Sequence, residues 1–463
     1  MGFAIAWPEN SLESAEGRRV PFSAEQGGEK TRRWIVNLVF IIYWLLILEG
    51  VLRKWIFPEA FKVLYFVRDP FVLLVYVIAL GNFREMPAKK FFVSWIVLGL
   101  SALLVGMAHL WIGENELIIF TYGWRNYFYY IPLAFIIGAI FRQSDLYRLI
   151  RQTMFMSIPV MLLVYLQIVS PPDAVINAGV SEIGLSIAGT ARGFVRTYGT
   201  FTSSPGQTLF AVSLMAMLLA TWMLPDHQRP VKGLLLLLAS GASTINLVLT
   251  GSRGGYVHSI VIMLFGLLSF LLLPNKAKIV RKIAVFLTIV TSTVLVLSAL
   301  NREALEAIFE RVEAAHYFEL EAYGPLATAG RIILDFTNFA QIFYFTPLFG
   351  HGVGWFGNAF SGRIFLMSIA EDDWSRNILE LGPVLGLVFL GYRISLVVWL
   401  TKAAVAEVKR SRNPVPLLFV GFIGVILLMG QITCHGSVNG YGWLFAGFCM
   451  ASNRIGNERN RAT

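Results

Sequence analysis

The sequence predicts an all-α polytopic membrane protein with about twelve transmembrane helices and both termini in the cytoplasm. Of its 463 residues, 56% are hydrophobic and 14% are charged, whereas soluble domains have about 45–50% apolar and about 25% charged residues. Apolar segments recur along the chain, and basic residues gather in alternate loops. The composition argues against a soluble enzyme or a disordered chain, and two cysteines exclude a disulfide scaffold.

Apolar segments account for the predicted helices, because a helix needs about 20 apolar residues to cross the hydrocarbon core. They lie at about 34–52, 61–80, 91–112, 118–141, 148–169, 206–224, 233–250, 255–273, 281–300, 377–400, 415–433 and 438–452. The transmembrane domain is therefore placed at 34–454, between cytoplasmic tails at 1–33 and 455–463. Residues 1–30 lack the apolar region of a cleavable signal peptide, so the first span is expected to act as an uncleaved anchor.

The distribution of lysine and arginine sets the predicted orientation, since cytoplasmic loops carry an excess of these residues. Most of the 38 basic residues lie in the two tails and in every second loop, such as Arg84, Lys89 and Lys90 in one loop. Topology thus explains the net charge of +10, and no nucleic-acid partner is needed. Two long loops, at about 170–205 and 301–376, are left on the outer side.

Some charged residues fall near or inside the predicted spans. Arg68 and Asp69 precede Pro70, and we interpret them as a structural ion pair where proline breaks the helix, with contact to a lipid phosphate as the alternative. Arg393 is expected to extend to the cytoplasmic face. In the second outer loop, the apolar segment 336–349 is too short to span, so we expect a helix lying at the membrane interface.

Three outer loops each place an arginine beside glycine or serine: Arg196, Arg253 and Arg331. A guanidinium group offers five donors in a fixed fork that suits phosphate oxygens, and a neighbouring glycine lets a bulky ligand approach the backbone. Any one of these arginines, taken singly, is more often solvated or in contact with a lipid headgroup. Together they predict an anion-binding site that faces the outside.

Four motifs between about 190 and 390 resemble, in the same order, motifs of the O-antigen polymerase and O-antigen ligase superfamily. They are Arg196-Thr-Tyr-Gly-Thr-Phe-Thr-Ser-Ser-Pro-Gly206, Thr250-Gly-Ser-Arg253-Gly254, Gly330-Arg331…Pro347-Leu-Phe-Gly350-His-Gly352 and Glu371-Asp372…Glu380-Leu-Gly382…Gly386. Two positions depart from the pattern. Gly206 replaces the asparagine of the first motif, and Glu371 stands where a ligase has its histidine, which favours a polymerase.

The resemblance implies a metal-independent glycosyltransferase of the bacterial inner membrane that uses no cofactor. Its donor would be a glycan on a polyprenyl diphosphate in the periplasmic leaflet, and it would work among membrane lipids, with a chain-length regulator left open as a partner. The acceptor would be another lipid-linked repeat for a polymerase, or a lipid A core for a ligase. A lipid-linked oligosaccharide flippase or transporter is the rival class, but we find no internal repeat, and the long loops share one face.

Site residues follow from this chemistry, because negative charge grows on the diphosphate as the anomeric bond breaks and arginines can neutralise it. The acceptor hydroxyl also needs a general base within hydrogen-bond reach. We assign diphosphate binding to Arg196 and Arg253, followed by Arg331 and Arg376. The candidate bases are Glu371 and Asp372, followed by His351. The alternative for the acidic residues is a solvated loop end or a charge at a helix amino terminus.

Overall fold

The computed structural model describes residues 26–80, 86–113, 115–181, 184–187, 190–191, 193–357 and 372–461, most of which are helical. The helices of the first half are α1 (Gln26–Val51), α2 (Phe61–Leu64), α3 (Asp69–Leu80), α4 (Lys89–Trp111), α5 (Leu117–Trp124), α6 (Ile131–Ile140), α7 (Gln143–Val169) and α8 (Ser204–Met223). Those of the second half are α9 (Gly233–Leu249), α10 (Arg253–Leu272), α11 (Lys276–Leu300), α12 (Arg302–Tyr323), α13 (Ala327–Thr337), α14 (Phe339–Ile342), α16 (Asp373–Ser411), α17 (Val415–Met429) and α18 (Gly436–Arg461).

Eight helices among the described residues are long and apolar enough to cross a membrane, and α9 and α17 are apolar but shorter. The chain is therefore a multi-pass membrane protein with a helical fold. Each apolar segment predicted to span the bilayer contains helix. The number of helices that cross and their orientation stay predictions.

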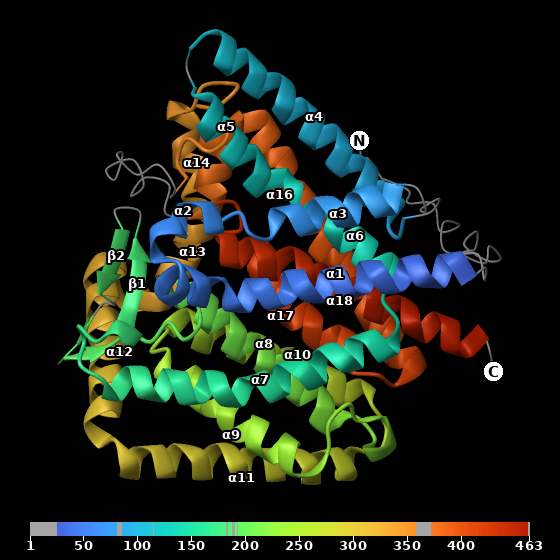
Figure 1. Cartoon of the computed structure of the whole chain (residues 1–463), viewed down its shortest axis with the longest axis vertical. Coiled ribbons are helices and arrows are strands. Elements are labelled where there is room, and N and C mark those ends of the chain that lie inside the picture. Colours follow the sequence, from blue (N-terminus) through green and yellow to red (C-terminus); the bar gives the residue numbers. More distant parts are fainter. Residues whose placement is uncertain are drawn as a thin grey trace, which may run out of the picture.

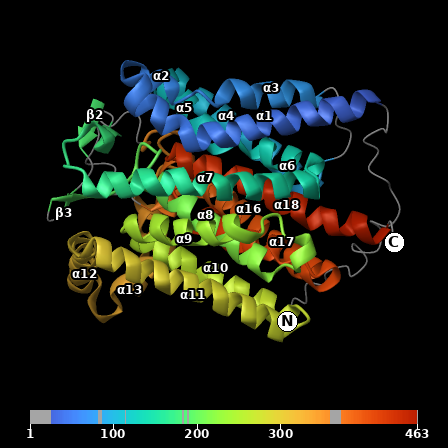
Figure 2. The same cartoon turned by 60° about the horizontal axis from the view of Figure 1, so that its bottom comes forward.

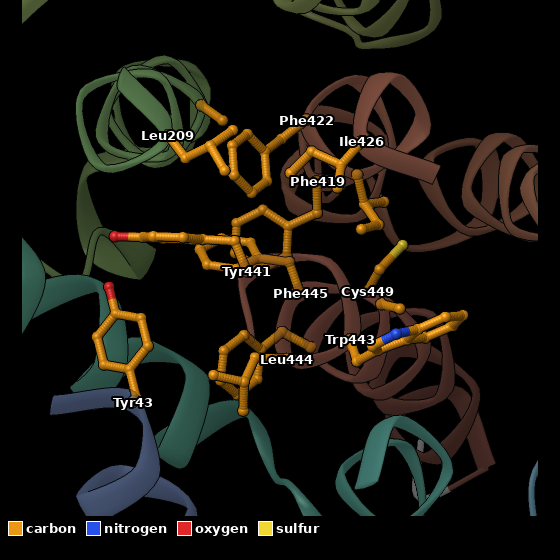
Figure 3. Packing of buried hydrophobic residues seen from close by; sticks show 14 of the residues in the cluster. Tyr43, Leu209, Phe419, Phe422, Ile426, Tyr441, Trp443, Leu444, Phe445 and Cys449 are labelled. Atoms are coloured by element: carbon orange, nitrogen blue, oxygen red, sulfur yellow. The ribbon is translucent and has the colours of Figure 1, made fainter. Parts of the chain in front are cut away.

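The helices form a bundle in which α8 is central (Figure 1). In the most apolar stretch of α8, 94% of the residues are buried, against 11% in α11. Aromatic side chains of α17 and α18 pack beside α8; the rings of Phe422 and Phe445 lie 4.6 Å apart, close to Leu209 and Tyr441 (Figure 3). Such packing matters in lipid, because helices there gain little from the hydrophobic effect and associate by close contact.

The described parts of the two long loops, which the sequence places on the outer side, contain strands and helices. The first contains two short antiparallel hairpins, β1 (Ala178–Ser181) with β2 (Gly184–Ile187) and β3 (Thr190–Ala191) with β4 (Phe194–Val195). The second begins with α12, which packs against α13. Figure 2 shows α12, α13 and the hairpins gathered at the end of the bundle away from the end of α18. The expected interfacial helix at 336–349 is not continuous, because it is divided between α13, α14 and a 3₁₀ turn at Phe343–Phe345.

Helix α16 is broken near its start, so the predicted span at 377–400 is not one straight helix. Gly382 has φ +81° and ψ 165°, and Pro383 follows it. This backbone conformation is open to glycine but strained for other residues. A Cβ atom on Gly386 would lie 2.8 Å from the Asn377 carbonyl oxygen, which shows that the chain after the bend packs on the leg before it.

A buried ion pair closes the two legs of α16 on each other. Arg393, 1% exposed, pairs through Nη1 with Asp373, which lies at the start of the helix. Its Nε donates to the Leu427 carbonyl oxygen at 2.7 Å, and Thr433 Oγ1 donates to Asp373 at 2.8 Å. The expectation that Arg393 extends to the cytoplasmic face is therefore wrong, because the bend brings a buried carboxylate within its reach.

The other charged residues of the spans also pair across helices. Arg68 Nε lies 3.2 Å from Glu49 on α1, and Arg125 donates two hydrogen bonds of 2.7 Å to Asp69. Arg68 and Asp69 thus link their segment to other helices, which gives them a structural role through partners that the sequence did not indicate. A charge inside a membrane protein is tolerated when it is paired in this way.

Candidate functional site

A cavity of about 550 Å³ lies where the amino-terminal ends of α8 and α10 meet α12, α13 and the connection between α17 and α18. Three of the four predicted arginines, Arg196, Arg253 and Arg331, line this cavity. A fourth lining arginine, Arg311 on α12, was not assigned from the sequence. We refer to these four residues as the arginine cluster.

The chain between α9 and α10 brings the first two arginines together. Gly251 has φ +55°, so the chain can turn sharply between the two helices. Ser252 then caps α10 by accepting a hydrogen bond from the Gly255 backbone nitrogen at 3.4 Å. Thr197 Oγ1 donates to the Leu249 carbonyl oxygen at 2.8 Å, which ties the segment of Arg196 to the end of α9. This contact, between residues 52 positions apart in the chain, places the segment of Arg196 beside the start of α10.

Two helix amino termini point their positive ends at this cavity. Helix α8 begins at Ser204, with Pro205 in its first turn, and α10 begins at Arg253. The first backbone N–H groups of a helix have no partner within the helix and favour an anion. Ser204 Oγ and the hydroxyl of Thr208 are buried in the same wall and have no hydrogen-bond partner among the described residues.

The glycine that replaces asparagine in the first motif is explained by packing. A Cβ atom on Gly206 would lie 2.4 Å from the ring of Phe201, which is 2% exposed. Phe201 therefore occupies the space that an asparagine side chain at position 206 would need.

Among the residues that the structure describes, no carboxylate forms an ion pair with Arg196. Its Nε atom is buried and has no hydrogen-bond partner among the described residues. Burial is the main reason that the pKa of Arg196 is lowered, and the charge of Arg253 lowers it further. Burial, followed by the charge of Arg196, also lowers the pKa of Arg311. These guanidinium groups repel one another across the cavity, so a bound anion would stabilise them.

Glu319 on α12 is a carboxylate that forms ion pairs with two arginines of the cluster. Its Oε2 lies 2.7 Å from Arg253 Nη1, and its Oε1 lies 3.4 Å from Arg331 Nη1. Thr328 Oγ1 donates a further hydrogen bond of 2.7 Å to Oε2. Burial by itself would raise the pKa of Glu319, but the Thr328 hydroxyl, Arg253 and Arg331 together hold it below its usual value.

The remaining polar groups of the cavity include Asp335, one turn after Arg331 on α13, and His435 before α18. Burial, followed by the positive charge of Arg376, lowers the pKa of His435 to about 4, so its imidazole is neutral at pH 7. Arg376 itself does not line the cavity. It is 2% exposed on the first leg of α16 and lies 3.9 Å from Asp373.

Of the predicted bases, the two that the structure describes, Asp372 and His351, do not line the cavity of the arginine cluster. Glu371 lies outside the described residues. Asp372 caps α16 by accepting from the Ser375 backbone nitrogen at 2.7 Å, and it accepts from Asn338 Nδ2 at 3.1 Å. Its position therefore fits the alternative, a charge at a helix amino terminus.

His351 lines a second cavity, of about 920 Å³, between α4 and the segment from Pro347 to Trp355. Its backbone nitrogen donates to the Leu379 carbonyl oxygen at 2.8 Å. The neighbouring Gly350, with φ +69°, would place a Cβ atom 2.5 Å from the Glu380 carbonyl oxygen. The third and fourth motifs thus pack against each other at the bend of α16, and the glycines between them make that approach possible.

Comparison with known proteins identifies no relative: no protein-family model matches the chain, and neither does any curated protein or solved structure. The geometry of the arginine cluster therefore carries the functional argument.

Proposed function

We propose that this chain is a glycosyltransferase that joins oligosaccharide repeats carried on polyprenyl diphosphate, and that the arginine cluster binds the diphosphate. One observation carries the proposal. Arg196, Arg253 at the start of α10 and Arg331 on α13 share one cavity with Arg311 and two helix amino termini. Among the described lining residues, four guanidinium groups face two carboxylates, Glu319 and Asp335, and this excess of positive charge suits a multiply charged phosphate ligand.

The size and lining of the cavity support a ligand with both polar and apolar parts. Its volume of about 550 Å³ falls within the usual range for ligand sites, about 300–1,000 Å³. Val425, Ile426 and Met429 of α17 add apolar side chains to the lining of the cavity. An isoprenoid chain can lie against these side chains while its diphosphate reaches the arginines.

In the proposed reaction, an acceptor hydroxyl oxygen attacks the anomeric carbon of the donor sugar, and the bond from that carbon to the diphosphate breaks. The electron pair stays on the leaving polyprenyl diphosphate, and the proton of the acceptor hydroxyl passes to a general base. Arginines already in place stabilise this growing negative charge without reorganisation, which is the usual largest contribution of such groups to catalysis. We place the reaction at the outer face of a bacterial inner membrane, with a chain-length regulator as an open partner.

A ligase is the second candidate, because His435 supplies a neutral imidazole in the cavity wall. The motif lacks a histidine at Glu371, but an imidazole from another part of the chain can act as a base. The acceptor would then be a lipid core or another non-repeat acceptor.

Glycan analysis of a strain that lacks this chain tests the proposal. The strain is complemented at matched membrane levels with wild type, Arg253→Ala, Arg196→Ala, or the control Arg302→Ala, an arginine of α12 that is 85% exposed in its side chain. We expect single lipid-linked repeats to accumulate with both cavity variants, and the control to restore polymer. Long polymer that stays on its lipid carrier in the deletion strain would indicate a ligase. Repeats trapped on the cytoplasmic leaflet would refute both and indicate a flippase.

A further inference from the structure

The carboxylate of Glu319 contacts two guanidinium groups that the proposed ligand needs. It contacts Arg253 at 2.7 Å and Arg331 at 3.4 Å, and its side chain is only 3% exposed. These two arginines come from different helices, α10 and α13, while Glu319 is on α12. The carboxylate therefore sits between two walls of the cavity, in the place where a phosphate oxygen would meet both guanidinium groups.

We propose that Glu319 is an exchangeable internal anion: its carboxylate neutralises Arg253 and Arg331 in the empty cavity, and a diphosphate displaces it on binding. The diphosphate part of this inference rests on the proposed function, but the exchange itself can be tested with inorganic pyrophosphate alone. Glu319 is thus a residue that sets affinity and specificity for anions.

The need for such an anion follows from burial. Guanidinium groups cannot lose their charge in proteins, so a buried cluster without a counter-ion would be strongly destabilising. Arg196 has a buried Nε without a partner among the described residues, which shows that one carboxylate does not satisfy the whole cluster. Glu319 therefore offsets part of the positive charge of the arginines, which favours folding. The positive charge that remains attracts an anion.

A carboxylate that can leave and return also affects the rate of turnover. A glycosyl diphosphate lipid carries a charge of about −2, whereas the released polyprenyl diphosphate approaches −3 because its terminal phosphate has a second pKa of about 6. The arginine cluster consequently binds the product more tightly than the donor. A carboxylate that returns to Arg253 and Arg331 competes with the product and speeds its release.

Thr328 favours this exchange. Its hydroxyl donates to the same Glu319 oxygen that contacts Arg253, at 2.7 Å. The hydrogen bond stabilises the ionised carboxylate in the empty cavity, so removal of the hydroxyl would weaken the competing anion while leaving all four arginines in place.

The test measures pyrophosphate binding by calorimetry to the purified full-length chain in detergent. We expect Glu319→Gln to bind pyrophosphate about tenfold more tightly than wild type, because the competing charge is gone. Thr328→Val should change affinity in the same direction by a smaller factor, which keeps the test valid if Glu319→Gln fails to fold. The matched control is Glu306→Gln on the same helix, whose partner Arg302 is exposed; it should bind as wild type does. Unchanged or weaker binding by the Glu319→Gln and Thr328→Val variants would overturn the inference.

A kinetic measurement separates this role from others. With lipid-linked repeats as substrate, Glu319→Gln should complete its first turnover at the wild-type rate and then slow several-fold, giving a burst. A variant that fails in the first turnover would identify Glu319 as the general base and overturn the exchange role. Tighter pyrophosphate binding without any glycosyl transfer by wild type would refute the proposed function and leave the anion exchange standing.

Discussion

The ion pair between Arg393 and Asp373 should be among the most sensitive features of the fold. Both residues are buried, at 1% and 2% exposure, and they join the two legs of α16. Arg393→Met keeps much of the side-chain volume and removes the charge. Losing one partner of a buried pair costs about 3–5 kcal/mol, because the other charge stays buried. Here Thr433 still donates to Asp373, and Arg376 lies 3.9 Å away, so we expect the lower part of that range, about 3 kcal/mol.

The assay is equilibrium unfolding of the purified protein in mixed micelles, followed by helical circular dichroism. The control is Lys402→Met, an exposed position on the same helix, which should change the free energy of unfolding by less than about 0.5 kcal/mol. The double variant with Asp373→Asn should lose less than the sum of the single losses, because it leaves no unpaired carboxylate. An Arg393→Met variant as stable as the Lys402→Met control, or strict additivity in the double variant, would refute this reasoning.

Two further predictions concern the bend of α16 and the start of α1. Gly382→Ala should destabilise the protein by about 1–3 kcal/mol, since φ is +81° and the new Cβ atom would lie 2.2 Å from the Leu348 carbonyl oxygen. Thermal unfolding measures this loss. The control is Gly391→Ala in the same helix, where the added Cβ atom meets open space. Glu29, mainly through its hydrogen bond with Arg32, has its pKa lowered to about 2. Its stabilisation is therefore present above pH 4.5 and is lost as the pH falls towards 2; an unfolding series over that interval should show less loss for Glu29→Gln than for wild type, and the same loss in both would contradict the assignment.

The helices could be predicted from sequence because the bilayer imposes a simple rule. A spanning segment must satisfy its own backbone and be long enough to cross, so composition and length locate it without knowledge of its neighbours. Every predicted span accordingly contains helix. A second local signal was the glycine or serine near Arg196, Arg253 and Arg331, which predicted that these arginines share a binding site. The three residues do line one cavity.

Other parts of the site were missed because residues 301–323 were interpreted as a loop. Arg311 and Glu319 are eight residues apart, and on a helix such a spacing puts both on one face. The charged composition of α12 hid this pattern, since it lacks the apolar runs by which the spans were recognised. The bend at Gly382-Pro383 also had a local signal, because proline ends or kinks a helix.

Sequence alone determined that this is a helical membrane protein and indicated three arginines, Arg196, Arg253 and Arg331, that line one cavity, since both depend on properties of short segments. Only the tertiary structure decided which charges meet. Asp69 pairs with Arg125, Asp373 with Arg393 across a bend, and Glu319 with arginines of two other helices. The physical reason is that the energy of an ion pair depends on a separation of a few ångströms and on burial. Neither quantity exists until the helices pack.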